Sequence, residues 1–278
     1  MVERAPDPRR VRRIAAVVAA LLLPAAAHAQ YRHAPGDTVR YHEVTRADSE
    51  IRAPQGTITI RSHHDARIAL AFAPGDTARA WYEALTLRSA HPSGESTPAT
   101  TALLGKPFVL TVTPRGAVET LVVPEIPREV AEVTNLALQF DDFFLRLPAV
   151  PLRAGLEWSD TTHHQTVGAD ARTVRITRIG RFRVRGDTTV GGVRALAIEA
   201  RMQNRIESSG PSPTPGMDMR TSQQGAETGV FVFAPGEGRL LARRREGLLT
   251  GEIEFTGGPQ PVRIPQKLTY QSTIERVR

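Results

Sequence analysis

Cysteine is absent from the 278 residues, which excludes disulfides, thiolate metal sites and cysteine nucleophiles. Aromatic residues make up only 5% of the chain, and lysine occurs only at Lys106 and Lys267. No apolar run approaches the roughly 20 residues that a membrane-spanning helix needs. Hydrophobic and charged residues, at 40% and 23%, are close to the globular average, which excludes collagen, coiled coil and wholesale disorder. We therefore expect a globular fold stabilised by buried surface.

The first 29 residues have the three parts of a secretory signal peptide. Four arginines between positions 9 and 13 precede an apolar run at residues 14–23, and Ala27 and Ala29 supply small side chains for a cleavage site. The alternative is an uncleaved anchor, but the apolar run is too short to span a bilayer. We expect cleavage near Ala29 and one β-rich domain at residues 30–278, in the periplasm or outside the cell and without a transmembrane anchor.

Most of the surplus positive charge comes from the leader rather than from the expected mature chain. Residues 1–29 hold five of the 36 basic residues and two of the 29 acidic ones, so the net charge falls from +7 to +4 after cleavage. A surplus this small gives little support to nucleic-acid binding, and we expect no nucleic-acid partner.

Apolar residues recur at every second position along most of the expected mature chain. Ile68, Leu70 and Phe72 form one such series, and Ile198, Ala200 and Met202 form another. This alternation predicts strands with one apolar and one wet face, as in antiparallel sheets. Glycine-containing turns separate the runs, so we expect about ten to twelve strands in one curved antiparallel sheet or half-barrel. Two polar segments, at about residues 91–99 and 208–225, are expected to be flexible loops.

One segment departs from the alternation. At residues 127–147, apolar side chains fall at spacings of three and four, and Pro127 and Pro148 mark the two ends. This spacing predicts a single amphipathic helix packed on the sheet.

Three short motifs carry a resemblance to secreted bacterial proteins of families without an assigned function. They are Gly36-Asp37-Thr38-Val39-Arg40-Tyr41, the strand pair at residues 108–118 and Gly155-Leu156-Glu157-Trp158. The arrangement also resembles the LolA/LppX-like half-barrel carriers of lipoproteins and lipids. The resemblance implies a curved sheet that wraps around a helix and leaves an apolar hollow.

The predicted helix and sheet offer a candidate binding site for an apolar molecule. We expect it to be lined by the aromatic side chains Phe108, Phe140, Phe143, Phe144 and Trp158. The protein would then bind a lipid or another apolar ligand between sheet and helix. The alternative is that these side chains fill a dry core.

Arginines are unusually dense in one strand region. On a strand, one face would carry four arginines: Arg175, Arg181, Arg183 and Arg185. A second run of arginines lies at residues 243–245. If the two runs were neighbours, they would form a cationic strip for anionic head groups at the mouth of the site. The alternative is a solvated sheet face paired with glutamates.

Catalytic and metal-binding patterns are weak. The pairs His63-His64 and His163-His164 lack metal-ligand spacing. Asp141-Asp142 is interpreted as solvated helix surface or as a salt bridge to Arg146. We therefore predict no catalytic residue, no metal and no cofactor. Two alternatives to the carrier remain: an interaction module of the cell envelope with a protein or polysaccharide partner, and an envelope hydrolase of another type.

Overall fold

The computed structural model describes residues 30–167, 172–212, 216–258 and 260–277. The expected leader and its cleavage site therefore lie outside the described residues. In these ranges, twelve strands form one sheet, accompanied only by three helical pieces of three or four residues. The strands are β1 Thr38–Ala53, β2 Gly56–Phe72, β3 Thr77–His91, β4 Gly94–Ser96, β5 Phe108–Val112, β6 Val118–Val122, β7 Glu157–Val167, β8 Thr173–Val190, β9 Val193–Pro211, β10 Asp218–Ala234, β11 Arg239–Thr256 and β12 Val262–Val277.

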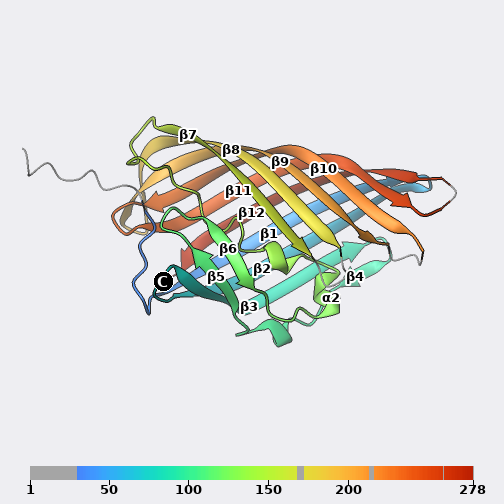
Figure 1. Cartoon of the computed structure of the whole chain (residues 1–278), viewed down its shortest axis with the longest axis horizontal. Helices are drawn as coiled ribbons and strands as arrows, with labels where there is room; N and C mark the ends of the chain where they lie inside the picture. Colours follow the sequence, from blue (N-terminus) through green and yellow to red (C-terminus); the bar gives the residue numbers. More distant parts are fainter. Residues whose placement is uncertain (1–29, 168–171, 213–215, 259, 278) are drawn as a thin grey trace, which may run out of the picture.

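Neighbouring strands are antiparallel, and their order is β6-β5-β3-β2-β1-β12-β11-β10-β9-β8-β7, with β4 attached to β3 (Figure 1). The first and last strands pair with each other in the middle of the sheet. The sheet is not closed, because β6 and β7 are its two edges. The predicted mainly β, antiparallel fold and the number of strands are confirmed.

Sequence chemistry explains both the alternation and the turns. Phe182 and Val184 of β8 point inward and are buried, whereas Arg181 and Arg183 point outward. The hairpin between β8 and β9 turns at Gly191-Gly192, where both φ values are positive, at 56° and 82°. A two-residue turn of this kind matches the twist of the flanking strands and favours glycine.

The segment at residues 123–156, named here the inner segment, runs along the concave side of the curled sheet (Figure 1). It contains only α2 (Arg128–Ala131) and η2 (Leu136–Leu138) as helical pieces. The predicted amphipathic helix at residues 127–147 is therefore wrong. The helical spacing reflects burial against a sheet that surrounds the segment, so apolar side chains on several sides find partners.

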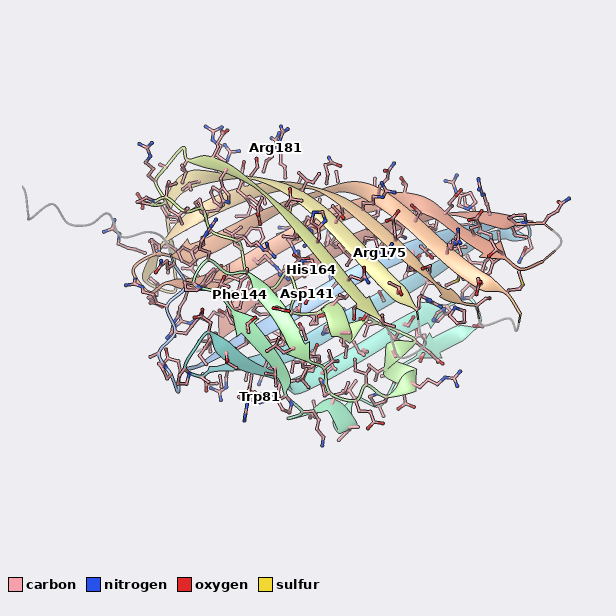
Figure 2. All side chains as sticks on the ribbon, in the orientation of Figure 1. Trp81, Asp141, Phe144, His164, Arg175 and Arg181 are labelled. Carbon is pink, nitrogen blue, oxygen red and sulfur yellow. The ribbon has the colours of Figure 1, made fainter. Side chains whose placement is uncertain are left out.

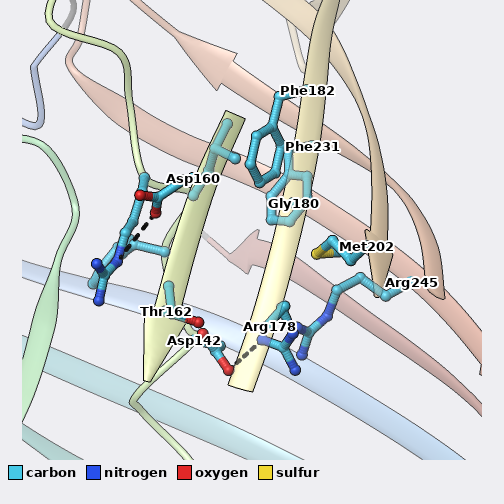
Figure 3. A pocket seen from close by; sticks show the side chains of 12 residues that line it. Asp142, Asp160, Thr162, Arg178, Gly180, Phe182, Met202, Phe231 and Arg245 are labelled. Atoms are coloured by element: carbon cyan, nitrogen blue, oxygen red, sulfur yellow. Dashed lines mark ion pairs between the residues drawn. The ribbon is translucent and has the colours of Figure 1, made fainter. Parts of the chain in front are cut away.

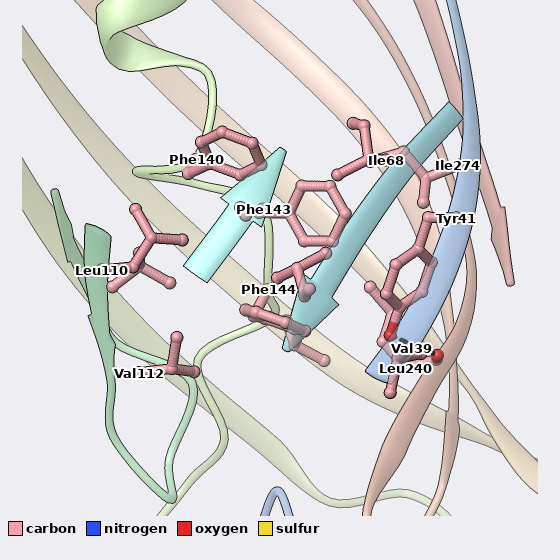
Figure 4. Packing of buried hydrophobic residues seen from close by; sticks show 14 of the residues in the cluster. Val39, Tyr41, Ile68, Leu110, Val112, Phe140, Phe143, Phe144, Leu240 and Ile274 are labelled. Carbon is pink, nitrogen blue, oxygen red and sulfur yellow. Dashed lines mark hydrogen bonds between the residues drawn. The ribbon is translucent and has the colours of Figure 1, made fainter. Parts of the chain in front are cut away.

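The core lies between the inner segment and the sheet (Figure 4). Phe143 packs edge-on against Tyr41 of β1, with ring centroids 5.1 Å apart, and Phe140 packs against Phe108 of β5 at 5.0 Å. Such edge-to-face pairs add about 1 kcal/mol each to the free energy gained from burial.

The two segments expected to be flexible loops contain strand residues. Residues 94–96 form β4, residues 208–211 end β9, and residues 218–225 begin β10, whereas residues 213–215 lie outside the described residues. No helix in the described ranges is long and apolar enough to cross a membrane.

Candidate functional site

Charged side chains point inward near the middle of several strands. Glu43 of β1, Glu227 of β10 and Arg243 of β11 are almost completely buried, which is rare for charged residues unless they are paired. They join other inward side chains and two carboxylates of the inner segment in what we call the inner charge network. Its members are Glu43, Asp141, Asp142, His164, Arg178, Glu227, Arg243 and Arg245.

His164 of β7 lies between two carboxylates of the inner segment. Its Nδ1 is 3.3 Å from Oδ2 of Asp141, and its Nε2 is 3.4 Å from Oδ1 of Asp142. A ring with a carboxylate at each nitrogen is most stable as imidazolium, because both nitrogens then carry protons. Asp141, followed by Asp142, raises the pKa of His164 to about 9. His164 is therefore charged at neutral pH and is not available as a general base.

Arg178 of β8 connects two of the buried acids. It forms ion pairs with Asp142 and with Glu227, the latter at 3.8 Å. Burial opposes the ionisation of Asp142, but Arg178 and then His164 outweigh it and hold the pKa of Asp142 below its usual range. Burial likewise opposes the ionisation of Glu227, but Arg245 and Arg178 keep its pKa low. Both carboxylates are therefore ionised.

Arg243 ties the inner segment to the sheet. Its guanidinium donates hydrogen bonds to the main-chain oxygens of Asp142 (2.8 Å) and Phe143 (3.2 Å), and it lies 3.4 Å from Oε1 of Glu43. Glu43 also accepts a hydrogen bond from Gln139 of the inner segment. Burial, with a contribution from Arg245, lowers the pKa of Arg243. This cation therefore depends on its acidic partner and on the carbonyl groups.

The inner charge network is formally neutral. Its four carboxylates face three guanidinium groups and the imidazolium of His164. Isolated buried charges would cost several kcal/mol each, whereas a balanced set is tolerated when its members also form hydrogen bonds.

The network also bridges the two edges of the open sheet. Asp141 accepts a hydrogen bond from the hydroxyl of Thr120 on β6 at 3.0 Å, and its other oxygen faces His164 on β7. The role that this geometry supports is structural, because it holds the inner segment in place and links the edges. Within the described ranges, no group of three histidine or acidic side chains is arranged to hold a metal ion.

Two concavities are present in the described part of the chain, and neither suits an acyl chain. The first, beside Asp142 and Arg178, measures about 30 Å³, which is room for one or two water molecules (Figure 3). The second, at the ends of β8 to β11, measures about 340 Å³, and all of its lining residues are polar or charged, Arg220 and Glu252 among them.

The structure brings the five predicted aromatic residues into one core. Phe108, Phe140, Phe143 and Phe144 are buried, and Trp158 is half-buried against them. The indole nitrogen of Trp158 donates a hydrogen bond to a main-chain oxygen of the inner segment, at 3.2 Å. These rings pack against one another and against the sheet, and the cavity beside them holds only water-sized space.

The three predicted arginines lie on the opposite face of the sheet from the aromatic residues. Arg181, Arg183 and Arg185 all point outward from β8 and are exposed. Figure 2 shows Arg181 on this face. Arg183 pairs with Glu157 at 3.5 Å, and Arg185 pairs with Glu199. The structure therefore does not bring these arginines to the mouth of a shared aromatic site.

The two arginine runs are also not adjacent, because β9 and β10 lie between β8 and β11. Within the second run, Arg243 and Arg245 point inward and Arg244 points outward. The two arginine runs therefore do not form the predicted cationic strip.

Sequence reasoning missed the buried acids and their partners. Asp141 and Asp142 were interpreted as helix surface, but both lie in the inner charge network. One signal was present in the sequence. Arg178 is an odd number of residues from each outward arginine of its strand, so it belongs to the opposite, inward face. Glu227 carries a similar signal, because it occupies an inward position between two glycines that also face inward.

Comparisons with known proteins give no family. No family model matches the chain, and no curated protein matches it. Among solved structures, the translocator domain of autotransporter NalP from Neisseria meningitidis is 9% identical, with 97% of this chain and 95% of that chain covered and a TM-score of 0.23. An outer membrane channel from Pseudomonas putida F1 is 10% identical, with 89% and 98% covered and a TM-score of 0.23. OccK2 (OpdF) of Pseudomonas aeruginosa is 7% identical, with 87% and 98% covered and a TM-score of 0.23.

The comparisons correct the resemblance to LolA/LppX-like carriers. The solved structures to which the chain is similar include a translocator domain and an outer membrane channel rather than carriers of that type. That resemblance is therefore withdrawn.

Proposed function

We propose that the protein is an exported, non-enzymatic interaction module of the cell envelope that makes its contacts through the outward face of its sheet. The observation that carries this proposal is the filled concave side. The inner segment occupies the part of it that holds the buried core, fixed by the inner charge network and the aromatic residues. A face that is filled by the protein's own chain leaves the outward face for partners.

The chemistry of the outward face supports the same proposal. Outward positions along β8 and β9 are mostly charged or polar, as with Arg183, Glu199 and Arg205. A charged side chain on a strand that faces lipid tails costs about 2–4 kcal/mol near the membrane centre. Outward faces of this kind are suited to water and to polar or charged partners.

An acyl-chain carrier gains no support from the geometry. A pocket for a ligand of that size measures several hundred Å³ and is mostly apolar. The concavity beside the aromatic core measures about 30 Å³, and the larger one is polar. The signal peptide predicted from the sequence of residues 1–29 is the basis for proposing export.

Native mass spectrometry of the protein from a bacterial envelope tests the filled interior. We expect the mass of the bare polypeptide beginning at Gln30. A lipid that co-purifies reproducibly at one molecule per chain and that crosslinks to the inward position Ser208 would overturn the proposal.

Site-specific photo-crosslinking in cells tests which face makes the contacts. Gln203 and Ser208 lie on the same strand, but Gln203 is exposed on the outward face and Ser208 is half-buried on the inward face. A photoreactive residue at position 203 should crosslink to envelope components, whereas the matched residue at position 208 should not. Crosslinks from position 208 alone would identify the concave side as the binding face.

A further inference from the structure

Two arginines lie directly opposite each other on the outward face of β8 and β9. Arg181 is the register partner of Arg201, and both side chains are exposed (Figure 2 labels Arg181). Neither makes an ion pair or hydrogen bond with another described residue, in contrast to Arg183 and Arg185, which each have a glutamate partner. Like charges in this cross-strand position destabilise a sheet unless an anion lies between them.

Two acids of the outward face lie near this pair, and both have other partners: Glu199 pairs with Arg185, and Glu246 accepts a hydrogen bond from Thr228 at 3.5 Å. The hydrogen bond from Arg185 is the main cause of the lowered pKa of Glu199. Arg201 lowers this pKa only through space, without a hydrogen bond. The arginine pair therefore remains open to an external anion.

Exposed aliphatic side chains surround the arginine pair. Ile179 precedes Arg181 by two residues on the same face and is 51% exposed. Val230 and Leu248, on β10 and β11, are 42% and 45% exposed. The register places them on either side of Thr228, which is the partner of Arg201. Single exposed aliphatics are ordinary, but here Ile179 lies two residues from Arg181 and Val230 lies on the strand next to Arg201.

Arg244 adds a third cation. It is exposed and is the register partner of Val230. We define the outer patch as Arg181, Arg201, Arg244, Ile179, Val230 and Leu248. It combines positive charge with aliphatic surface over four adjacent strands, and Glu199 and Glu246 lie on the same face beside it.

We propose that the outer patch binds the anionic head groups of a lipid membrane surface. Guanidinium groups bind phosphate with two parallel hydrogen bonds, and aliphatic side chains next to them enter the boundary between head groups and acyl chains. A free phosphate or an acidic polysaccharide would use the arginines but would leave the aliphatic side chains in water. This inference rests on the proposed function, because it names the partner of the outward face.

Vesicle binding by the full mature protein tests the inference. We expect binding to vesicles of phosphatidylglycerol mixed with phosphatidylcholine, and much weaker binding to phosphatidylcholine alone. Replacing both opposed arginines, Arg181→Gln with Arg201→Gln, should weaken binding about 30-fold. Each basic residue near an anionic surface contributes a similar amount to the free energy of binding, and the two losses add. Binding that equals the wild type in this double variant would overturn the inference.

A matched variant controls for charge alone. Arg61 and Arg88 are exposed on the outward face of β2 and β3, and Arg61→Gln with Arg88→Gln removes the same charge from the other half of the sheet. This control should change binding less than about threefold, because screening limits the reach of distant charges. An equal loss in both double variants would refute a localised patch.

A third variant separates a lipid surface from a soluble anion. Ile179→Ser with Leu248→Ser keeps the arginines and should weaken vesicle binding while leaving the binding of inorganic phosphate unchanged. Unchanged vesicle binding would overturn the lipid assignment in favour of a soluble anion. If position 203 crosslinks to envelope components but no vesicle binding occurs, the proposed function stands and this inference fails.

Discussion

Replacing Arg243 by methionine should detach the inner segment from the sheet. The side chain is 3% exposed and has three partners: a carboxylate oxygen of Glu43 at 3.4 Å and two main-chain oxygens at 2.8 and 3.2 Å. Methionine retains much of the side-chain length but provides no donor. The variant Arg243→Met therefore leaves Glu43 charged, buried and without its cation.

The magnitude follows from the loss of one partner of a buried pair, which costs about 3–5 kcal/mol. In a domain of this size, each kcal/mol lowers the midpoint of thermal unfolding by about 2–4 °C. We therefore expect a decrease on the order of 10 °C for Arg243→Met. Neutralising the remaining acid with Glu43→Gln should restore about 1–3 kcal/mol, since the amide oxygen can still accept the hydrogen bond from Gln139.

Thermal unfolding followed by circular dichroism, together with urea titration, measures these differences. The control is Arg263→Met, because Arg263 is exposed and pairs with Glu254 at 3.0 Å. Surface pairs of this kind contribute less than about 1 kcal/mol. The reasoning fails if Arg243→Met is as mild as the control, or if Glu43→Gln adds its full separate cost in the double variant.

Three further predictions concern other parts of the same interior. The two carboxylate partners of His164 raise its pKa to about 9. The stabilisation from its charged form is therefore complete below pH 6.5 and is lost as pH rises to 9. The unfolding free energy should fall by about 3 kcal/mol over that range, and His164→Gln should abolish this fall. Burial, followed by a nearby arginine, lowers the pKa of His33 to about 4, so its contribution is lost as pH falls from 6.5 to 4. His33→Phe keeps the stack on Phe72 (3.6 Å between centroids). In this variant, the unfolding free energy measured by urea titration should fall less between pH 6.5 and pH 4. Gly116→Ala should cost about 2 kcal/mol or more, since φ is +82° and the new Cβ would lie 2.5 Å from a main-chain oxygen of the inner segment; Gly105→Ala, at φ +70° in open space, should cost about 1 kcal/mol.

Each of these predictions has an outcome that contradicts it. An imidazole resonance of His164 that titrates near pH 6.5 by NMR would show that the carboxylates do not hold its proton. If the unfolding free energy of His33→Phe falls between pH 6.5 and pH 4 as much as that of the wild type, another group causes the fall. Equal costs at Gly116 and Gly105 would mean that the inner segment does not approach the first glycine closely.

The sheet was predictable because alternation is a local property of the chain. Ile198, Ala200 and Met202 occupy every second position, and this spacing puts them on one face whatever lies next to the strand. Strand order is not local in this sense. The pairing of β1 with β12 joins the two ends of the sequence. The arginine runs are separated because β9 and β10 pair with each other and with β8 and β11, and nothing in the runs themselves reveals this.

The candidate site was predictable only in part for the same reason. The aromatic residues were recognised as interior because their large apolar surface favours burial in almost any arrangement. Asp141 and Asp142 are interior only because Arg178 and His164 approach from two strands. Acids are usually exposed, so the sequence favours the solvated interpretation until those partners are known.

The failure of the predicted helix has a specific physical cause. A helix satisfies its main-chain oxygens internally, whereas the inner segment uses side-chain donors that come from elsewhere in the fold. Arg243 binds the main-chain oxygens of residues 142 and 143, Tyr31 that of residue 145, Trp158 that of residue 146 and Arg115 that of residue 147. An amphipathic helix also needs a wet face, and a sheet that curls around the segment removes most of it. Spacings of three and four therefore predict a helix only where one side of the chain faces water; in an enclosed segment with external donors, the same spacing is compatible with irregular backbone.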